Sequence, residues 1–596
     1  MDGSTMNRET TFLKRSLLPT LAFVLLAPLS GAGAQEDPEL NVLMQALRDE
    51  LARSTEELQM EGLERPYFIA YTVRETERIE ASASFGALLS NTEDKSRRLA
   101  VEVRVGNPTF DNTNFSSMSF FPSSFGPGGS LPLENDYREI RRQIWLATDA
   151  AYKSALETLA ERRAALQNET RAEDIADFTP EEPFSFYSDA GPDLPPRSAL
   201  ADLVRGLSGQ FRNMPDIFES RVVATVRHQR TYYLNSEGSA FIRSDPTASV
   251  VIEAHTQAPD GTELDDSVAT YGSSWAEVDD RPALEAHVEA IGGSLAARRS
   301  APPLDRYNGP VLFEGQAAAE LFAQVFMPKL LGTRVPDAEP QFARMMQQDR
   351  NPFLDRIGAR VLPRSLSVQD DPTLDADGFL GGYAVDDDAV EAGPTVLIEN
   401  GILRTLLTTR NPVPGIDRST GNRRGEGPLP SNVLLTSSRP MTRDELKAEF
   451  MQLIEERGAG YGIVVRRVAG RDEGDLESAF SFMMSGPEAA PGVGSLIGVF
   501  KVLPDGTEEL IPKAELAGIS AAAFRDIVEV SDTATLYSLP QSSGGGSLPS
   551  FVLAALSMDS IVTASVPDLL FEELSIRKPS GNAPHLPVAK HPYFDE

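Results

Sequence analysis

The spacing of hydrophobic residues predicts helices and strands along most of the chain. Between residues 38 and 54, apolar side chains recur every three or four positions, which predicts an amphipathic helix. From Tyr67 to Val105 apolar and polar residues alternate. This predicts three antiparallel strands with one face in water and a turn at Asn91–Arg97. Helical spacing returns from Asp136 to Gln167 and predicts a long helix.

The second half of the pattern is richer in strands, and a β-rich unit begins near Tyr307. The further expected elements are strands at 220–226 and 228–235, helices at 276–298, Gly315–Leu331 and Thr442–Arg457, and hairpin turns at Asn400–Gly401 and Asp505–Gly506. The fold class is therefore α+β, with an N-terminal α/β portion that contains an antiparallel sheet and a long helix, and a β-rich C-terminal domain.

Changes in composition divide the chain into four segments. Residues 106–134 are rich in Ser, Asn, Gly, Pro and Phe, as in a surface loop, and prolines cluster between residues 180 and 196, as in a linker. We expect a signal peptide at 1–34, an α/β domain with the Gly/Phe/Pro-rich insertion and long helix at 35–196, a sheet–helix domain at 197–305, and a β-rich domain at 306–596.

The first 34 residues have the three parts of an export signal. Arg8, Lys14 and Arg15 are basic, Ser16–Leu29 is apolar but short for a membrane span, and Ala32–Ala34 has the small residues of a cleavage site. An uncleaved anchor is the alternative, which two prolines in the apolar stretch disfavour. We therefore expect an exported protein, periplasmic or secreted, with no membrane span after cleavage.

The net charge and the cysteine content exclude several classes of partner and of catalytic site. The 596 residues carry a formal net charge of −33, and an acidic protein repels nucleic-acid phosphates, so DNA or RNA is not an expected partner. The chain contains no cysteine, which excludes disulfides, thiolate metal ligands and a cysteine nucleophile. It contains five histidines, and no two of them have a helical spacing suited to one metal ion.

Several separated segments carry a family resemblance. They are YLNSEGS at Tyr233–Ser239, GPVLFEGQAAAELF at Gly309–Phe322, VLIENGIL at Val396–Leu403, STGNRR at Ser419–Arg424, ELAGISAAAFRDI at Glu515–Ile527 and SVPDLLFEELSIRK at Ser565–Lys578. In this order they resemble the TldD/PmbA family, metallopeptidase-related proteins once called modulators of DNA gyrase. The resemblance implies an N-terminal α/β portion, a C-terminal barrel-like domain, and dimers around a cavity in which unfolded peptides are cleaved.

The catalytic members of this family carry His-Glu-x-x-x-His on a helix and a cysteine nearer the C-terminus, which together bind Zn²⁺. Two histidines five positions apart lie about 140° apart around a regular α-helix, so the motif requires a bent or unwound helix. In an ungapped comparison, Phe322 and Ala323 occupy the positions of the first His and the Glu, and Met327 that of the second His. We therefore expect no catalytic residues of the family type, no metal and no other cofactor.

Two polar segments remain as candidate sites. Asn422, Arg423 and Arg424 form either a solvent-exposed turn or part of the cleft that the resemblance implies, where guanidinium groups would hold a peptide carboxylate. The run Asp386–Asp388 has the oxygen ligands that a hard cation prefers, although acidic residues before a strand are commonly only solvated.

Three functions are consistent with these features. The first is an exported TldD/PmbA-like pseudopeptidase, a non-catalytic subunit that holds peptide or unfolded protein in a dimer cavity. It would act as a homodimer or as a heterodimer with a catalytic TldD-type relative. The alternatives are an active peptidase with a non-standard site, in which Asp386–Asp388 would bind an oxygen-ligated metal, and a structural envelope protein.

Overall fold

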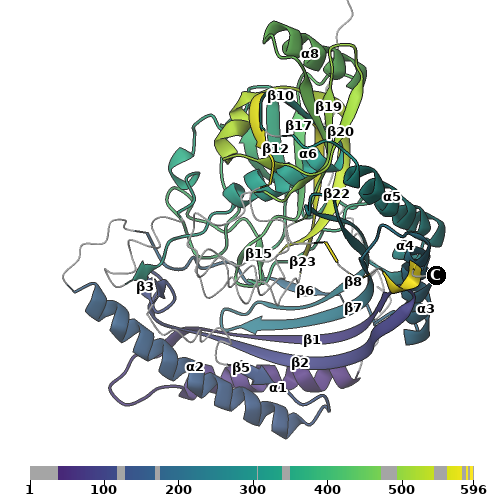
Figure 1. The fold of residues 1–596 in the computed structure, drawn as a ribbon. Helices are drawn as coiled ribbons and strands as arrows, with labels where there is room; N and C mark the ends of the chain where they lie inside the picture. The colour runs from purple at the N-terminus through teal and green to yellow at the C-terminus, as the bar shows by residue number, and fades with distance from the viewer. Residues whose placement is uncertain are drawn as a thin grey trace, which may run out of the picture.

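A computed structural model describes residues 38–116, 128–167, 175–188, 190–304, 306–338, 350–470, 493–541, 560–579, 586–587, 589 and 591–594. Figure 1 shows a long curved sheet with helices beneath it and a second, β-rich unit above it. The expected signal peptide at 1–34 lies outside the described residues, as does part of the Gly/Phe/Pro-rich insertion. No helix in the described ranges has the length and apolar character needed to cross a membrane.

The N-terminal half is built on an eight-stranded sheet with the main order β3–β2–β1–β7–β8–β6, to which β5 adds beside β2 and β9 beside β8. The strands are β1 (Pro66–Ser84), β2 (Ala87–Asn107), β3 (Phe110–Asp111), β5 (Gly128–Ser130), β6 (Ser185–Tyr187), β7 (Glu219–Asn235), β8 (Ala240–Gln257) and β9 (Glu263–Gly272). A separate short pair joins β4 (Phe115–Ser116) to β11 (Asp337–Ala338) of the C-terminal half. The expected antiparallel sheet is confirmed.

Helices cover one face of this sheet. They are α1 (Pro38–Glu57), α2 (Tyr137–Ala165), α3 (Arg197–Gln210), α4 (Trp275–Val278) and α5 (Arg281–Arg299). Tyr71 and Val73 of β1 pack in the core with α1 and α2, and Ala81 of the same strand packs with α3 and α5. Because side chains alternate along a strand, the residues between them face the C-terminal unit. The expected long helix is confirmed, and Asp136 caps it by accepting hydrogen bonds from the first backbone N–H groups.

Two expectations in the N-terminal half are wrong: the region from Tyr67 to Val105 forms two strands and not three, and segments 220–226 and 228–235 are not separate strands. Residues 91–97 lie inside β2, and the chain reverses instead at Phe85–Gly86, where both residues have positive φ. Segments 220–226 and 228–235 are one continuous strand, β7, whose partners are β1 and β8. In both stretches only every second side chain faces the helices, and the residues between them lie on the face of the sheet that no helix covers. The pairing of β1 with β7 also places residues on both sides of position 196 in one sheet.

The C-terminal half holds an eleven-stranded sheet with the main order β14–β13–β12–β17–β23–β10–β18–β19–β20, to which β21 and β22 add beside β23. Its strands are β10 (Arg306–Phe313), β12 (Leu366–Asp370), β13 (Thr395–Glu399), β14 (Ile402–Leu403), β17 (Asn432–Ser437), β18 (Gly462–Val468), β19 (Leu496–Val502), β20 (Glu508–Ile511), β21 (Glu515–Leu516), β22 (Ile527–Gln541) and β23 (Ser560–Arg577). The β-rich character is confirmed. A barrel is not formed by the described strands, because β14 and β20 end the order without pairing with each other.

In this half, the hairpin turns and the helix predicted from short sequence patterns are confirmed. Asn400 and Gly401 form the left-handed turn between β13 and β14, and Gly506 that between β19 and β20. Helix α8 (Arg443–Glu456) begins with a capping box in which Thr442 and Glu445 bond to each other's backbone. A separate hairpin joins β15 (Arg423–Arg424) to β16 (Gly427–Pro428).

Candidate functional site

The helix expected at Gly315–Leu331 has three parts. Residues Gln316–Leu321 are α-helical (α6), Phe322–Phe326 form a π-turn, and Met327–Leu330 form a 3₁₀ turn. The backbone N–H of Met327 bonds to the carbonyl of Phe322. Such an i→i+5 bond brings the first and last residues of the turn one above the other, which a regular α-helix does not do. The backbone therefore has the bend that two ligands five positions apart require.

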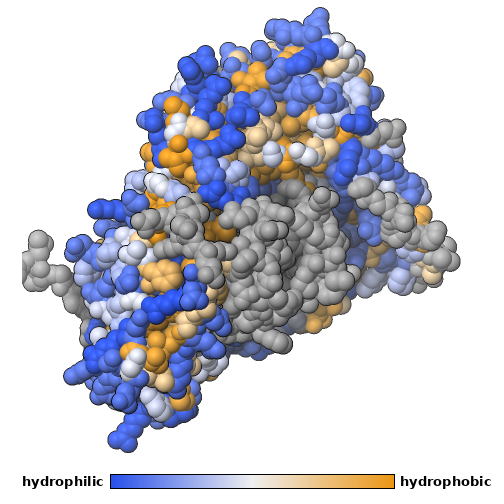
Figure 2. Space-filling view, turned by 90° about the vertical axis from the view of Figure 1, so that its left-hand side faces the viewer, coloured by the Kyte–Doolittle hydropathy of each residue, from blue (hydrophilic) through white to orange (hydrophobic). Residues whose placement is uncertain are grey.

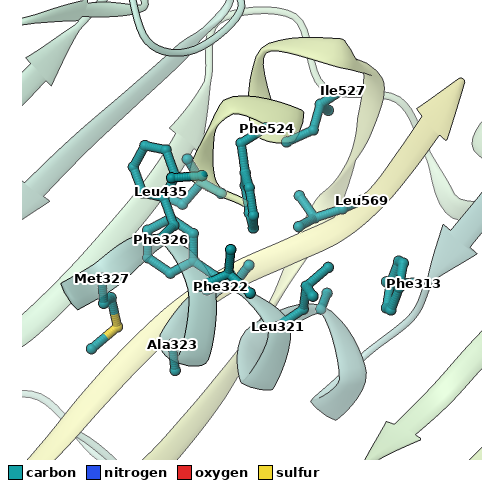
Figure 3. Packing of buried hydrophobic residues seen from close by; sticks show 14 of the residues in the cluster. Phe313, Leu321, Phe322, Ala323, Phe326, Met327, Leu435, Phe524, Ile527 and Leu569 are labelled. Carbon is teal, nitrogen blue, oxygen red and sulfur yellow. The ribbon is translucent and has the colours of Figure 1, made fainter. Parts of the chain in front are cut away.

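The side chains on this π-turn do not fit a metal ion. Phe322, Ala323 and Met327 are 0%, 1% and 0% exposed and offer no oxygen or nitrogen ligand. In Figure 3, Phe322 and Phe326 point toward Phe524, with the Phe322 and Phe326 rings 5.3 Å apart. They belong to the largest hydrophobic core of the C-terminal half. In the described part of the chain, no three His, Cys, Asp or Glu residues gather to suit a metal ion.

A polar group that the sequence analysis did not single out lies on the same helix. Glu320 and Gln324 are 2% and 6% exposed, and the Gln324 amide donates to the Glu320 carboxylate over 2.5 Å. Gln324 also donates to the carbonyl of Ala469 and accepts from the backbone N–H of Gly494. Tyr537 of β22 hydrogen-bonds to Glu320. An i,i+4 pair of polar residues in an otherwise apolar helix was the available sequence signal.

The first of the three consecutive aspartates closes its own loop. One oxygen of Asp386 accepts from the backbone N–H groups of Asp388 and Val390, and the other accepts from that of Arg423. Burial and the neighbouring Asp388 raise the pKa of Asp386 to about 8, against the lowering effect of these backbone bonds. The Asp386 side chain therefore holds the backbone of residues 386–390 and of Arg423 in place through these hydrogen bonds.

Asp387 joins the two halves of the molecule. Its carboxylate accepts from Arg243 at 2.8 Å and Arg74 at 3.1 Å, both on the N-terminal sheet, and from the backbone N–H of Gly425. Burial alone would raise the pKa of Asp387, but the guanidinium groups of Arg243, Arg74 and Arg424, together with the Gly425 N–H, outweigh it and hold this pKa well below its ordinary value.

Asp388 completes the set by binding Arg423 at 2.5 Å and the backbone N–H of Arg410. Each oxygen of the three carboxylates thus accepts at least one hydrogen bond from the protein. N–H groups and guanidinium ions already occupy the positions that a cation would take. The run Asp386–Asp388 is therefore an arginine-neutralised contact between the two halves, and the oxygen-ligated metal site considered from the sequence does not fit it.

The segment Asn422–Arg424 lies beside this contact, and its three side chains have different surroundings. Asn422 is fully buried and donates to Asp370 and to the Tyr383 hydroxyl. Arg423 is bound to Asp388 and is also 3.3 Å from Glu102. Arg424 is half-buried, with its guanidinium 4.6 Å above the Tyr383 ring. Arg424 also adds to the positive charge around Asp387.

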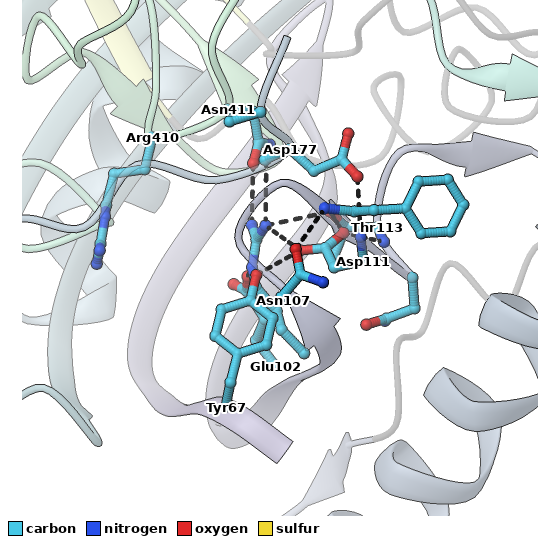
Figure 4. A network of polar contacts seen from close by, with 12 residues as sticks. Tyr67, Glu102, Asn107, Asp111, Thr113, Asp177, Arg410 and Asn411 are labelled. Atoms are coloured by element: carbon cyan, nitrogen blue, oxygen red, sulfur yellow. Dashed lines mark hydrogen bonds and ion pairs between the residues drawn. The ribbon is translucent and has the colours of Figure 1, made fainter. Parts of the chain in front are cut away.

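A second polar network joins the halves next to this segment, and Figure 4 shows part of it. Arg104 of β2 bonds to Asp111 and Asn411. Its guanidinium lies 3.9 Å from the centre of the Phe178 ring, and that of Arg410 lies 4.0 Å from it. Because all three side chains are almost fully buried, these contacts hold the segment around Phe178 between β2 and the Arg410 segment of the C-terminal half.

Comparison with known proteins places this architecture in a family. Residues 306–489 match a family model described as the PmbA/TldA metallopeptidase C-terminal domain. A metalloprotease of Methanocaldococcus jannaschii is 38% identical over 109 residues, 18% of this chain and 24% of that protein. A metalloprotease of Methanothermobacter thermautotrophicus is 26% identical over 243 residues, 39% of this chain and 49% of that protein. The chain thus matches about a quarter to a half of the length of these relatives.

The fold extends the likeness beyond these segments. The structure of TldE from Thermococcus kodakarensis aligns with 89% of this chain and all of that chain, with a TM-score of 0.55 and 15% identity. The two sheets, with a π-turn set in the core of the second, define an α+β protein of the TldE fold. Residues 306–489 thus carry the C-terminal domain of the TldD/PmbA family of metallopeptidase-related proteins, and the chain as a whole has a fold like that of TldE, as the sequence motifs indicated.

Proposed function

We propose that this chain is an exported, non-catalytic member of the TldD/PmbA family that holds an unfolded peptide as one subunit of a dimer. The observation that carries the proposal is the π-turn. Its backbone has the bend that the family's metal motif requires, while Phe322, Ala323 and Met327 are buried in the hydrophobic core. The chain keeps the bent backbone of the family motif but lacks the metal ligands and the glutamate that would activate water. Such a chain can bind a peptide without cleaving it.

The surfaces between the two halves support peptide holding. The face of β1 turned toward the C-terminal unit carries the partly exposed polar residues Thr72, Arg74 and Thr76, and the exposed Arg78. Side chains of this kind bind backbone amides and carboxylates without selecting a sequence. Arg424, half-buried above Tyr383, is placed to bind a peptide carboxylate. On the face shown in Figure 2, blue hydrophilic areas surround separate orange hydrophobic patches on both units.

The test uses the chain from residue 35 onward, the form expected after signal removal, with metal analysis and an assay on a fluorogenic unfolded peptide. We expect micromolar peptide binding, no stoichiometric transition metal and no turnover. Stoichiometric metal together with turnover that survives further purification would overturn the non-catalytic assignment.

Partner and location are tested in the native host. Tagged protein is expected outside the inner membrane and shortened by its signal peptide. It should co-purify with a relative that carries His-Glu-x-x-x-His. Recovery of this chain alone, as a stoichiometric dimer with itself, would replace the heterodimer by a homodimer. Full-length protein confined to the cytoplasm would overturn export.

A further inference from the structure

A groove lies on the N-terminal half, between α1 and the turn that joins β7 to β8. Helix α1 is beneath the sheet in Figure 1, and the groove beside it has a volume of about 430 Å³. Binding sites for small molecules have volumes of this order. Leu51 and Ala52 of α1, with Leu234 and Ala240 of the two strands, give the groove an apolar lining. A ligand with apolar groups therefore removes hydrophobic surface from water when it binds there.

The turn that forms one wall of the groove is held in shape by its own side chains. Asn235 accepts hydrogen bonds from two backbone N–H groups of the turn, at 3.1 and 3.0 Å. Ser236 accepts from the N–H of Ile69, and Ser239 accepts from that of Phe184. A serine hydroxyl that accepts one hydrogen bond still has its own proton to donate, so both serines can donate to a ligand in the groove. This wall is thus formed before a ligand binds.

Two charged side chains line the groove at separate points along α1. Arg48 and Glu56 are both exposed, and within the described residues neither side chain forms an ion pair or a hydrogen bond. By contrast, Arg53 of the same helix pairs with Glu50 and Glu57. Arg48 and Glu56 are eight positions apart, which is about 12 Å along an α-helix. The groove therefore offers one positive and one negative group at the two ends of an apolar surface.

We propose that this groove binds a short peptide with two free ends and an apolar residue between them. Arg48 binds the terminal carboxylate, Glu56 binds the terminal ammonium group, and the apolar lining contacts the side chain between them. Three to four residues of extended chain span about 10–14 Å, which matches the separation of the two charged residues. Ser236 and Ser239 donate to backbone carbonyl oxygens of the peptide. The groove shares no residue with the site proposed between the two halves, so the inference does not depend on that function.

The experiment compares the tripeptide Ala-Leu-Ala with three modified forms: N-acetylated, C-amidated, and with serine in place of leucine. Affinities are measured by ligand-observed NMR titration with the wild-type chain. A peptide of this size predicts a dissociation constant of about 0.1–1 mM for the free form. Loss of one charged contact at an exposed site predicts about three- to tenfold weaker binding of the acetylated and of the amidated form. Loss of the apolar side chain should weaken binding by about fivefold or more.

Variants connect these preferences to the groove. In Arg48→Gln the effect of amidation should fall to within about twofold while the effect of acetylation stays, and in Glu56→Gln the reverse is expected. Arg138→Gln, at an exposed position of α2, is the matched control and should leave both preferences unchanged. Glutamine has a helix propensity close to those of arginine and glutamate, so we expect all three variants to fold, and circular dichroism checks this.

The outcomes are distinct from those that test peptide holding. Equal wild-type affinity for the free, acetylated and amidated tripeptides overturns the groove site, and so does failure of the free tripeptide to bind. Preferences that persist in folded Arg48→Gln and Glu56→Gln also overturn it. A long unfolded peptide blocked at both ends tests the site between the two halves, and it should bind these variants as it binds the wild type. Failure of this long peptide to bind the wild type overturns peptide holding alone.

Discussion

The backbone N–H of Met327 donates a hydrogen bond to the carbonyl of Phe322, five residues earlier in the chain. This bond closes a single π-turn between an α-helical and a 3₁₀ segment, and both side chains are fully buried. The unusual backbone is therefore supported by hydrophobic packing, where catalytic relatives are expected to place ligands. In the family motif a bent helix carries metal-binding side chains. In this chain the helix is bent in the same place, but its side chains pack in the core.

The packing at the π-turn predicts a large loss of stability on truncation. Phe322→Ala removes a fully buried ring that contacts Phe326 and Phe524, and we expect the free energy of unfolding to fall by about 3–5 kcal/mol. Trp145→Ala, at a residue 48% exposed on α2, should cost less than about 1 kcal/mol. Urea unfolding followed by circular dichroism measures both. A loss at Phe322 no larger than at Trp145 would contradict the packing described.

The ion pairs of Asp387 with Arg74 and Arg243 allow a prediction of how much the contact between the two halves contributes to stability. Asp387→Asn removes the carboxylate that Arg74 and Arg243 share; because Arg243 keeps its ion pair with Asp245 and Arg74 is partly exposed, we expect a loss of about 1–3 kcal/mol in unfolding free energy. Asp377→Asn, at an exposed position of the same segment, is the matched control and should change little. Addition of Mg²⁺ or Ca²⁺ should leave the melting temperature of the wild type unchanged. Stabilisation by either ion that disappears in Asp387→Asn would revive the cation site.

The buried carboxyl of Asp370 predicts a pH dependence. Burial raises its pKa to about 6, despite hydrogen bonds from Ser431 and Asn422. Because the folded state holds this proton more tightly than the unfolded state, stability from this group is present at low pH and is lost as pH rises from about 4 to about 6. The unfolding free energy of the wild type minus that of Asp370→Asn should fall by roughly 3 kcal/mol between pH 4 and pH 7. A constant difference would show that Asp370 is ionised throughout.

The Phe178 ring between two guanidinium groups predicts a loss beyond that of volume. Phe178→Leu keeps a buried apolar side chain but removes the ring face, and we expect about 2–4 kcal/mol of destabilisation from the contacts with Arg104 and Arg410. Phe211→Leu, a fully buried residue directly after α3, is the control for the change of shape and should cost about 1 kcal/mol. Equal losses in the two variants would mean that packing alone explains the position of Phe178.

Arg424 predicts selectivity for a carboxylate. If it binds the C-terminus of a peptide, Arg424→Gln should weaken binding of a peptide with a free carboxylate by about 1–2 kcal/mol and leave its amidated version unaffected. Arg418→Gln, at an exposed residue of the same loop region, is the control. Fluorescence anisotropy with both peptides gives the affinities. Equal weakening for the two peptides would assign Arg424 a structural role through Tyr383.

The sequence by itself determined the features that depend on residues close together along the chain: one helix, one hairpin turn and the missing metal ligands. The period of the apolar positions located α2, the Asn400–Gly401 pair located a hairpin, and the absence of histidine, glutamate and cysteine at the motif positions removed the family's metal ligands. Each of these signals is local, because a helical face, a left-handed turn or a missing ligand is read within a few residues.

Only the tertiary structure decided which polar residues meet. Asp387 is more than 140 positions from Arg243 and more than 300 from Arg74, yet one contact holds all three. The sequence of residues 91–97 is polar and predicts a turn when it is considered alone. In the structure these residues form part of a strand, because β1 supplies their hydrogen-bond partners. Glu320 meets Tyr537 only because β22, more than 200 residues further along the chain, packs against its helix. Burial and long-range pairing give these residues their energies, and neither is encoded in the spacing of adjacent residues.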